Sequence, residues 1–467
     1  MRDYSFGNFL HELRLRRGLT QYQLGALVGV SDKAVSKWEN GSSRPQSNIL
    51  YKLCEVLGIS VDELLTCKYH TLENKDKKGV FAMKKQLWNK AFDAMCKRYG
   101  NPAPIAITNR FLTEQAEMQN TDMIVYFDML SALAAEARKR GEHICVRGGT
   151  GASFVAYLLG ATGINPLKPH YYCPECHKVV FDGSADDGWD LAGGKCSCGQ
   201  EMCTDGHDIP FETYRHVVRR NTSFDVSVSP EFIPYAKAVV QDYFRDCKLT
   251  PDEREPGRVI TFAVSSGSGE CSVTLCADDE MTRHKALEEA TGTRFERVRF
   301  AFDTVLKEIC SCHAYGIAER FMKDFAPKTF HDLIQIQGLS LWGDDADTPI
   351  LRGYPVGKAI AYRDDVFNRI QEKMLANGMA DTGFAYRVME DTRRGLYAKN
   401  GVPDDVRADL KAIGMEDGFV EAIGRIRYLF PKAYGVACVR SAAIRAWYKL
   451  NYPEEFKGIC GTSAETV

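Results

Sequence analysis

Four cysteines near the middle of the chain have the types and spacing of a metal site. Residues 173–176 read CPEC, and after about twenty polar and glycine-rich residues, residues 196–199 read CSCG. Two cysteine hairpins at this separation are typical of a zinc ribbon, whose four thiolates leave no open position for catalysis. The predicted ligands of a structural zinc are Cys173, Cys176, Cys196 and Cys198. The second hairpin is one residue short, so Cys203 and His177 are alternative ligands, and a relic ribbon without metal is the competing interpretation.

A glycine cluster, VRGGTGASFVAYLLG at residues 146–160, precedes the cysteines. The pattern indicates the end of a strand, a tight turn and an apolar helix that starts near residue 153. Backbone N–H groups of such a turn bind phosphate, and a neighbouring arginine adds positive charge. The candidate nucleotide-binding residues are Arg147, Gly148, Gly149 and Ser153. An ordinary glycine turn is the alternative, because the Lys-Ser/Thr ending of a nucleoside-triphosphatase loop is missing.

Length and composition indicate which scaffold carries these residues. A chain of 467 residues, 45% hydrophobic and 26% charged, predicts several folded domains and excludes a disordered, collagen-like or coiled-coil protein. The net charge of -2 gives no global basic field, so DNA contacts must come from local patches. No apolar run approaches the roughly 20 residues of a membrane span, and charges throughout residues 1–18 argue against a signal peptide. We therefore expect a cytoplasmic protein without membrane contact, whose 16 cysteines stay reduced.

Residues 1–66 predict a compact all-helical domain. Apolar residues recur at helical spacing from Phe6 to Leu13, and Thr20 has the chemistry of a helix cap before a second apolar stretch. A Gly-Val-Ser turn at residues 29–31 separates this stretch from a third helix over residues 32–40. The string LRLRRGLTQYQLGALVGVSDKAVSKWENGSSRP strongly resembles the Cro-like phage-repressor (XRE-type) family of helix-turn-helix domains.

This resemblance implies a DNA interface. In the family, the third helix enters the major groove of double-stranded DNA and the start of the second helix contacts phosphate. Gln21 is then the phosphate anchor, and Arg14 and Glu39 occupy the positions of an ion pair that orients the recognition helix. The implied groove-facing residues are Ser31, Asp32, Lys33, Ser36 and Lys37. The resemblance also implies a homodimer through this domain, whereas a helical adaptor without DNA binding is the alternative.

A second resemblance covers about residues 85–457. Residues 67–80 are polar and lysine-rich, which predicts a flexible linker. Beyond it, KRYGNPAPIAITNRFLTEQ (97–115), DGHDIPFETY (205–214) and RIRYLFPKAYGVACVRSAAIRAWYKLNYPEEF (425–456) strongly resemble the PolC-type DNA polymerase III alpha subunit of Gram-positive bacteria.

The two resemblances together imply an α+β multidomain protein. The all-α helix-turn-helix domain is followed by a polymerase-palm-like mixed sheet, an inserted zinc ribbon and a helical fingers-like region. The expected boundaries are 81–165 for the first palm-like part, 166–210 for the ribbon-like insert, 211–325 for a shortened second palm-like part, and 326–467 for the fingers-like region.

The catalytic residues of the polymerase family are mostly replaced in this chain. The family uses three aspartates to hold two magnesium ions for phosphoryl transfer. Only Asp225 remains, because Ser223 and Val273 occupy the positions matched to the other two aspartates. Only a short segment joins these two strands, and the nucleotide-contacting motifs that the family places there are absent from it. We therefore predict that polymerase activity has been lost.

Three functions stay open. The leading interpretation is a DNA-binding protein that acts as a regulator or as a replication-associated binding module. The alternative is an active DNA-directed DNA polymerase that uses magnesium at a rearranged site of Asp225 with Asp278 or Asp279. A third is a regulator whose body senses a nucleotide or a replisome partner. Basic residues that would contact DNA backbone from the body are Arg219, Arg220, Arg393, Arg394, Arg425, Arg427 and Lys432.

Overall fold

The computed structural model describes residues 4–17, 19–57, 64, 77–119, 123–215, 223–245, 247–255, 257–266, 269–295, 302–311, 326–341 and 356–461. The chain forms two compact units, Met1–Asp128 and Met129–Val467. No helix in these described ranges combines the length and the apolar character that a bilayer crossing requires.

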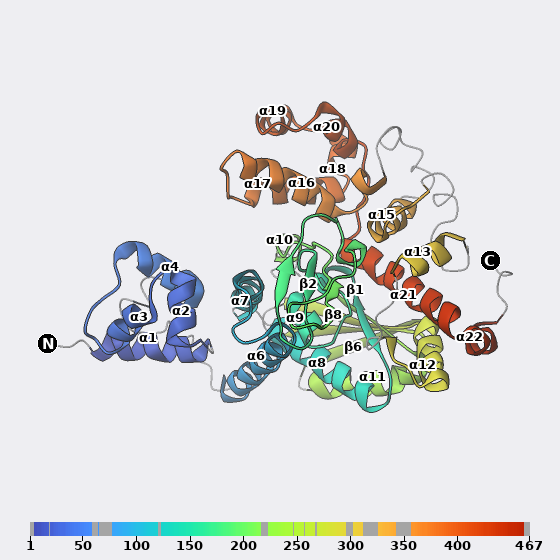
Figure 1. The fold of residues 1–467 in the computed structure, drawn as a ribbon, viewed down its shortest axis with the longest axis horizontal. Coiled ribbons are helices and arrows are strands. Elements are labelled where there is room, and N and C mark those ends of the chain that lie inside the picture. Colours follow the sequence, from blue (N-terminus) through green and yellow to red (C-terminus); the bar gives the residue numbers. More distant parts are fainter. Residues whose placement is uncertain are drawn as a thin grey trace. The chain divides into compact units, whose positions relative to one another are not determined.

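Four short helices with a common apolar core begin the first unit (Figure 1). They are α1 (Tyr4–Arg16), α2 (Gln21–Val28), α3 (Asp32–Glu39) and α4 (Ser47–Leu57). The Thr20 hydroxyl accepts the N–H of Gln23 and so begins α2, and the Ser31 hydroxyl accepts the N–H of Ala34 and so begins α3. Gly29, with φ of +79°, ends α2. The expected helix-turn-helix arrangement is confirmed.

Two glycines allow these helices to pack backbone against backbone. A Cβ atom at Gly7 of α1 would lie 2.2 Å from the carbonyl oxygen of Glu39, at the end of α3. A Cβ atom at Gly25 of α2 would lie 2.8 Å from the carbonyl oxygen of Val30 in the turn. Because any larger residue would push these segments apart, the two glycines help to fix where α3 lies.

Longer helices complete the first unit. They are α6 (Lys77–Tyr99) and α7 (Ile105–Gln119), whose Trp88 and Phe111 rings pack edge to face at 6.1 Å. Most of the predicted linker, residues 67–76, lies outside the described residues, and α6 begins within its last four residues. The next helix, α8 (Met123–Lys139), crosses the boundary between the units.

A five-stranded mixed sheet is the framework of the second unit. Its order is β1-β5-β8-β7-β6, and β5 and β8 are parallel whereas the other pairs are antiparallel. The strands are β1 (Ile144–Arg147), β5 (Ser223–Val228), β6 (Lys248–Glu255), β7 (Val259–Ser266) and β8 (Gly269–Ala277). This arrangement confirms the predicted mixed sheet.

The two faces of the sheet differ in polarity. One face carries fully or almost fully buried apolar side chains, namely Val146, Phe224, Val226, Val273, Leu275, Ile260 and Phe262. Side chains alternate between the faces along each strand, so Ser223, Asp225, Thr274 and Thr261 lie on the opposite face. Helix α11 (Ile233–Tyr243) packs against β8. The second face is therefore the polar surface of the palm-like part.

A small ribbon is inserted after β1. The turn η1 (Gly148–Ala152) and α9 (Phe154–Leu158) lead to a three-stranded antiparallel sheet of β2 (His170–Tyr172), β3 (Val179–Phe181) and β4 (Cys203–Asp205). A fully buried ion pair, His207 Nδ1 to Asp187 Oδ2 at 2.7 Å, ties its segments together. Asp190 accepts two backbone N–H groups at the start of α15 (Phe330–Ser340), which anchors the ribbon to the helical region.

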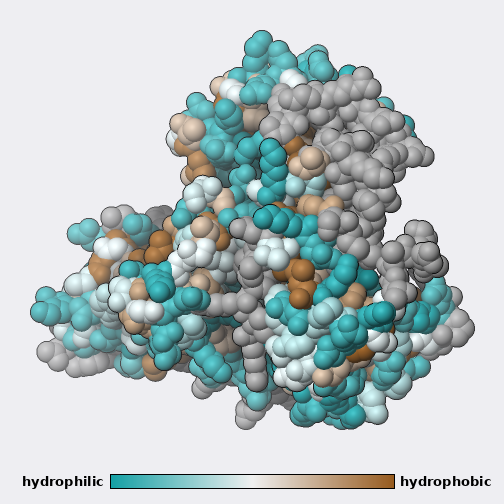
Figure 2. Space-filling view, turned by 45° about the vertical axis from the view of Figure 1, so that its right-hand side comes forward, coloured by the Kyte–Doolittle hydropathy of each residue, from teal (hydrophilic) through white to brown (hydrophobic). Residues whose placement is uncertain are grey.

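Helices make up the remainder of the second unit. Five of them share a core of their own: α16 (Arg363–Ala376), α17 (Gly383–Arg393), α18 (Leu396–Asn400), α19 (Asp404–Ala412) and α20 (Asp417–Ile423). The long helix α21 (Lys432–Asn451) packs against η1, α13 (Phe302–Ser311), α15 and α12 (Asp279–Thr291), and α22 (Pro453–Cys460) follows it. The short α10 (Glu212–Arg215) precedes β5. On the face shown in Figure 2, hydrophobic residues are scattered among hydrophilic ones.

Candidate functional site

The exposed side of α3 carries the residues expected to read DNA. Ser31, Asp32, Lys33 and Lys37 are exposed and Ser36 is half-buried, whereas Val35 and Trp38 are buried in the helical core. The structure thus brings the five predicted groove-facing residues to one short helix and its cap. Their contact with DNA stays a prediction.

One buried carboxylate holds the elements of this interface together. Glu39, at the end of α3, is 8% exposed. Its Oε2 atom accepts hydrogen bonds from Arg14 Nη2 at 3.0 Å and from Gln21 Nε2 at 2.8 Å, and His11 Nδ1 lies 2.8 Å from the same oxygen. The expected Arg14–Glu39 ion pair is present, and it also binds the side chain of Gln21. The carboxylate therefore links α1, the start of α2 and α3.

The electrostatics of Glu39 match this role. Burial alone would raise the pKa of Glu39, but hydrogen bonds from Arg14, Gln21 and His11 outweigh it and lower the pKa below the ordinary value of 4.5. The ionised carboxylate is thus favoured by folding, and its neighbours lose their common acceptor when it is protonated.

The glycine turn uses its polar groups mainly for its own structure. Gly148, with φ of +72°, begins η1, and Gly149 is half-buried beside it. The hydroxyl of Ser153 is fully buried and accepts the N–H of Ala156, so it caps α9. Arg147 lies opposite Asp225 in the strand register. Phosphate binding at these residues stays a prediction.

Asp225 lies in the middle of the polar sheet face, beside hydroxyl groups. In the parallel pair, Thr274 rather than Val273 is its neighbour on β8. Val273, the residue matched to a family aspartate, is fully buried on the apolar face, so its side chain does not lie beside Asp225. Ser223 and Thr274 both lack a carboxylate. Burial raises the pKa of Asp225, and a hydrogen bond from Thr274 opposes this shift in part.

The acidic residues proposed for a rearranged site lie elsewhere. Val228 pairs with Ala277, so Asp278 is four residues beyond the position of Asp225, about 13 Å along the strands. Asp278 caps α12, and Asp279 forms an ion pair with Arg258 at 2.8 Å. Carboxylates this far apart cannot share a metal ion. Among the described residues, the donors around Asp225 therefore do not fit the two magnesium ions of the polymerase reaction.

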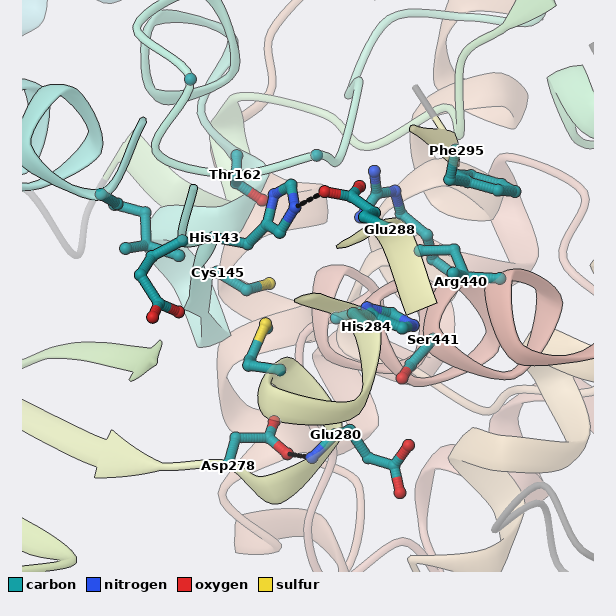
Figure 3. Close-up of a pocket in the computed structure, with 18 of the residues that line it drawn as sticks. His143, Cys145, Thr162, Asp278, Glu280, His284, Glu288, Phe295, Arg440 and Ser441 are labelled. Carbon is teal, nitrogen blue, oxygen red and sulfur yellow. Dashed lines mark hydrogen bonds and ion pairs between the residues drawn. The ribbon is translucent and has the colours of Figure 1, made fainter. Parts of the chain in front are cut away.

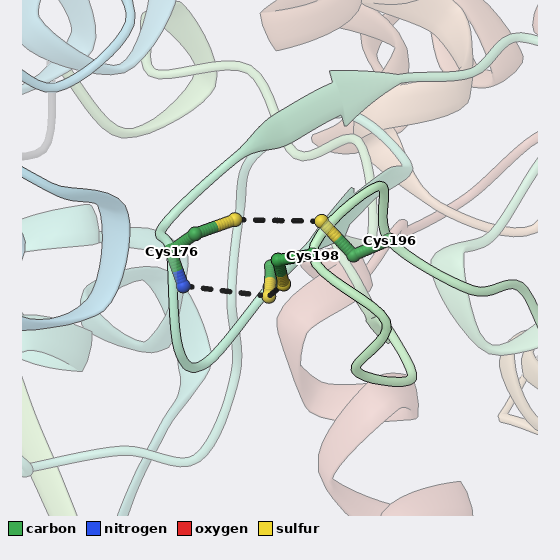
Figure 4. A group of neighbouring side chains, drawn as sticks. Cys176, Cys196 and Cys198 are labelled. Carbon is green, nitrogen blue, oxygen red and sulfur yellow. Dashed lines mark hydrogen bonds between the residues drawn. The ribbon is translucent and has the colours of Figure 1, made fainter.

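The four predicted cysteine ligands meet at one point. The sulfur atoms of Cys173, Cys176, Cys196 and Cys198 all lie within 4.8 Å of one another. Cys176 and Cys196 are 3.4 Å apart, and Cys173 and Cys198 are 3.5 Å apart (Figure 4). Sulfur atoms at these distances can surround one metal ion with bonds of about 2.3 Å. Within the described ranges, this is the only group of three or more metal-ligating residues that is close enough to hold an ion.

The backbone of the ribbon shapes this cluster. His177 has a positive φ of 60° after the first hairpin, and Gly199 has φ of 90° after the second. The N–H of Cys176 donates to the sulfur of Cys173, and a backbone hydrogen bond at Cys198 lowers the pKa of Cys196 to about 6. The alternative ligands His177 and Cys203 are not part of the group. The shorter second hairpin is thus compatible with four thiol ligands.

The basic residues of the body differ in their exposure. Lys432 is buried, and its Nζ donates to the carbonyl oxygen of His207 at 2.6 Å, so its expected contact with DNA backbone is corrected. Arg393 and Arg394 both pair with Glu390. Exposed basic side chains are found at Arg425 and Arg427. The other two basic residues, Arg219 and Arg220, lie outside the described residues.

Comparisons with known proteins identify both parts of the chain. Residues 10–64 match the family described as helix-turn-helix. Residues 85–243 match the family described as bacterial DNA polymerase III alpha NTPase domain. The chain is therefore a fusion of a helix-turn-helix domain with a region similar to PolC-type DNA polymerase III.

The relatives of the second part are much longer proteins. DNA polymerase III PolC-type from Caldanaerobacter subterraneus subsp. tengcongensis is 26% identical over 77% of this chain and 32% of the relative. The corresponding protein of Thermotoga petrophila is 26% identical over 77% of this chain and 33% of its own length, and that of Ureaplasma parvum is 27% identical over 77% and 32%. The chain thus spans about a third of the length of the curated relatives it matches.

The pH dependence of the first unit tests the role of Glu39. Its folded-state pKa is lowered, so its stabilisation is present above pH 4.5 and is lost as the pH falls through the folded-state pKa. We expect Glu39→Gln to lower the free energy of unfolding of a 1–66 fragment by about 1–3 kcal/mol at pH 7. We also expect the variant to lose less stability than wild type between pH 6 and pH 3. Urea unfolding followed by circular dichroism measures both effects. If the free energies of unfolding of wild type and Glu39→Gln change in parallel with pH, the role assigned to Glu39 is contradicted.

Proposed function

We propose that this protein is a DNA-binding regulator or replication-associated binding module. Its helix-turn-helix domain locates double-stranded DNA, and its PolC-like body serves as a second, non-catalytic binding surface. Residues 14, 21 and 39 position the reading helix, which presents Ser31, Asp32, Lys33, Ser36 and Lys37 to the major groove. The domain acts as a homodimer, and a replisome protein is the partner proposed for the body. We place the protein in the cytoplasm, where its thiols stay reduced.

The observation that carries this proposal is the shared carboxylate of Glu39. The Gln21 side chain, which would contact phosphate, is fixed to the same oxygen atom as Arg14. A reading helix and a phosphate anchor held by one buried group form a preorganised interface, which reduces the entropy lost on binding.

The loss of catalysis is supported by the surroundings of Asp225. Phosphoryl transfer requires carboxylates that clamp metal ions in a fixed geometry, and removal of one member of such a set slows the reaction by orders of magnitude. Asp225 has hydroxyl neighbours at Ser223 and Thr274 on its face of the sheet, and Asp278 is about 13 Å away along the strands. The alternative, an active DNA-directed DNA polymerase, is supported by the similarity to PolC-type DNA polymerase III.

We further propose that the four-cysteine cluster holds a structural zinc ion. Cys173, Cys176, Cys196 and Cys198 would supply all four ligands of a tetrahedral site, so zinc would stabilise the fold without activating a substrate. The ion would fix the two hairpins of the ribbon, which is anchored to the helical region through Asp190. The zinc ion would therefore stabilise the shape of the body.

Sequence-specific DNA binding is tested by selection from a randomised duplex library. We expect the full chain to enrich an inverted repeat, since two copies of the domain would read two half-sites. Lys33→Ala should weaken binding to the selected duplex by about tenfold and reduce its salt dependence if the lysine contacts phosphate. Fluorescence anisotropy at several salt concentrations measures both effects. Lys97→Ala, which changes an exposed lysine of α6, is the matched control. Equal affinities of the wild type, Lys33→Ala and Lys97→Ala for the selected duplex would contradict the proposal.

Metal analysis tests the zinc site. We expect about one zinc ion per purified chain, and its removal by a chelator should lower the melting temperature of the body. Cys176→Ser should lose the metal, whereas Cys203→Ser, which changes a cysteine outside the group, should keep it. Elemental analysis and thermal unfolding provide the two readouts. Wild-type protein that neither carries zinc nor gains stability from added zinc would contradict the assignment.

A further inference from the structure

The four cysteines of the ribbon form two close pairs, and each pair joins one hairpin to the other. The sulfur atom of Cys176 lies 3.4 Å from that of Cys196, and the sulfur atom of Cys173 lies 3.5 Å from that of Cys198 (Figure 4). The first hairpin supplies Cys173 and Cys176, and the second supplies Cys196 and Cys198. A covalent bond within either pair would therefore connect the two hairpins.

Each pair combines an exposed cysteine with a buried one. Cys176 and Cys198 are exposed, whereas Cys173 and Cys196 are buried. A small oxidant in the solvent therefore reaches one member of each pair, and the other member lies within 3.5 Å of it. Oxidation of cysteine follows thiolate character and access, and a second thiol nearby converts the first oxidation product into a disulfide. The exposed cysteine of each pair is thus placed to react first, and the buried cysteine is placed to resolve the product.

We propose that this cluster is a site of reversible oxidation by hydrogen peroxide, which links Cys176 to Cys196 and Cys173 to Cys198. In the first step, the exposed thiolate attacks one oxygen of the peroxide, the O–O bond breaks, and a sulfenic acid and a hydroxide ion form. In the second step, the buried thiolate attacks the sulfur of the sulfenic acid. The S–O bond breaks, the S–S bond forms, and a second hydroxide ion leaves. Both hydroxide ions take up a proton, so each disulfide costs two electrons from the thiolates and reduces one peroxide to two water molecules.

The metal-binding role of the same four thiolates adds a consequence. This consequence rests on the zinc site of the proposed function, whereas the pairing of the cysteines does not. Binding to zinc keeps the cysteines deprotonated, and the thiolate is the nucleophilic form. Two disulfides leave no thiolate in the cluster to hold the ion. The hairpins thus exchange a metal link for two covalent links, and a reducing thiol that attacks the disulfides restores the four ligands.

Cys145 offers an internal comparison, because it lies in a pocket rather than in a thiol cluster. The pocket has a volume of about 180 Å³ and lies between α8, β1, α12 and α21, with His284 in its wall (Figure 3). Among the described residues that line this pocket, Cys145 is the only cysteine. The pocket lining therefore supplies no second thiol for a disulfide with Cys145.

Disulfide mapping of the full chain tests the proposal. The reduced protein is treated with hydrogen peroxide, its remaining thiols are alkylated, and its tryptic peptides are analysed by mass spectrometry without reduction. Cleavage after Lys178 and Lys195 separates the two hairpins. We expect the two hairpin peptides to be linked after treatment and separate again after incubation with a reducing thiol, whereas the peptide of Cys145 stays unlinked. Disulfides confined to one hairpin, or cysteine sulfinic acids without a link, would overturn the proposal.

Paired substitutions test which cysteines react with each other. The double variant Cys173→Ser, Cys198→Ser keeps the close pair of Cys176 and Cys196, and it should form the link at about the wild-type rate. The double variant Cys173→Ser, Cys196→Ser keeps two exposed cysteines from different pairs, and it should form the link about fivefold more slowly. Equal rates in the two double variants would overturn the assigned pairing.

Zinc release separates this proposal from the proposed metal site. A chromogenic chelator should record about one zinc ion released per wild-type chain, with the same time course as the disulfides and not without peroxide. Links between the hairpins in a protein that carries no zinc would contradict the zinc assignment and support the pairing. Zinc-loaded protein that peroxide leaves unlinked would overturn the proposal and leave the zinc assignment intact.

Discussion

The parallel pairing of β5 with β8 is the interaction on which the body of this protein depends. It places Phe224, Val226, Val273 and Leu275 together on the buried face of the sheet, where their burial supplies much of the driving force for folding. The same register places Asp225 beside Thr274 on the polar face. Strand β8 ends at Ala277, and the next residue, Asp278, caps α12. One pairing thus determines both the core and the separation of the carboxylates.

The first unit also depends on one interaction, which is polar rather than apolar. The carboxylate of Glu39 collects groups from α1, α2 and α3, and the glycines at positions 7 and 25 allow the backbones to approach closely enough for these contacts. The comparisons match part of the first unit to the family described as helix-turn-helix, and residues 85–243 to the family described as bacterial DNA polymerase III alpha NTPase domain. The two units differ in what the polar groups do: those of the first unit organise a surface, whereas the described neighbours of Asp225 on its face of the sheet are the hydroxyl residues Ser223 and Thr274.

Local features of the sequence predicted much of this structure. The cap at Thr20, the glycine turn and the two cysteine hairpins all act over a few residues, so spacing alone located them. It was harder to predict from the sequence which residues of two distant strands lie opposite each other. Val273, which was matched to a family aspartate, does not share a face with Asp225, because one residue along a strand moves a side chain to the other face. Lys432 was expected at the surface because charge alone does not reveal burial. The pocket around His284 joins segments from α8 to α21 that no local pattern connects.

The central claim is that this polymerase-like body binds without catalysing nucleotide transfer. Primer extension on a primed template tests it most directly, with magnesium or manganese and over a wide range of protein concentration. The wild-type chain is compared with Asp225→Asn, in preparations that both bind duplex DNA. The account predicts no extension by either protein, because the described neighbours of Asp225 on its face of the sheet, Ser223 and Thr274, carry no carboxylate for the metal ions. Extension by the wild type that disappears in Asp225→Asn would contradict it.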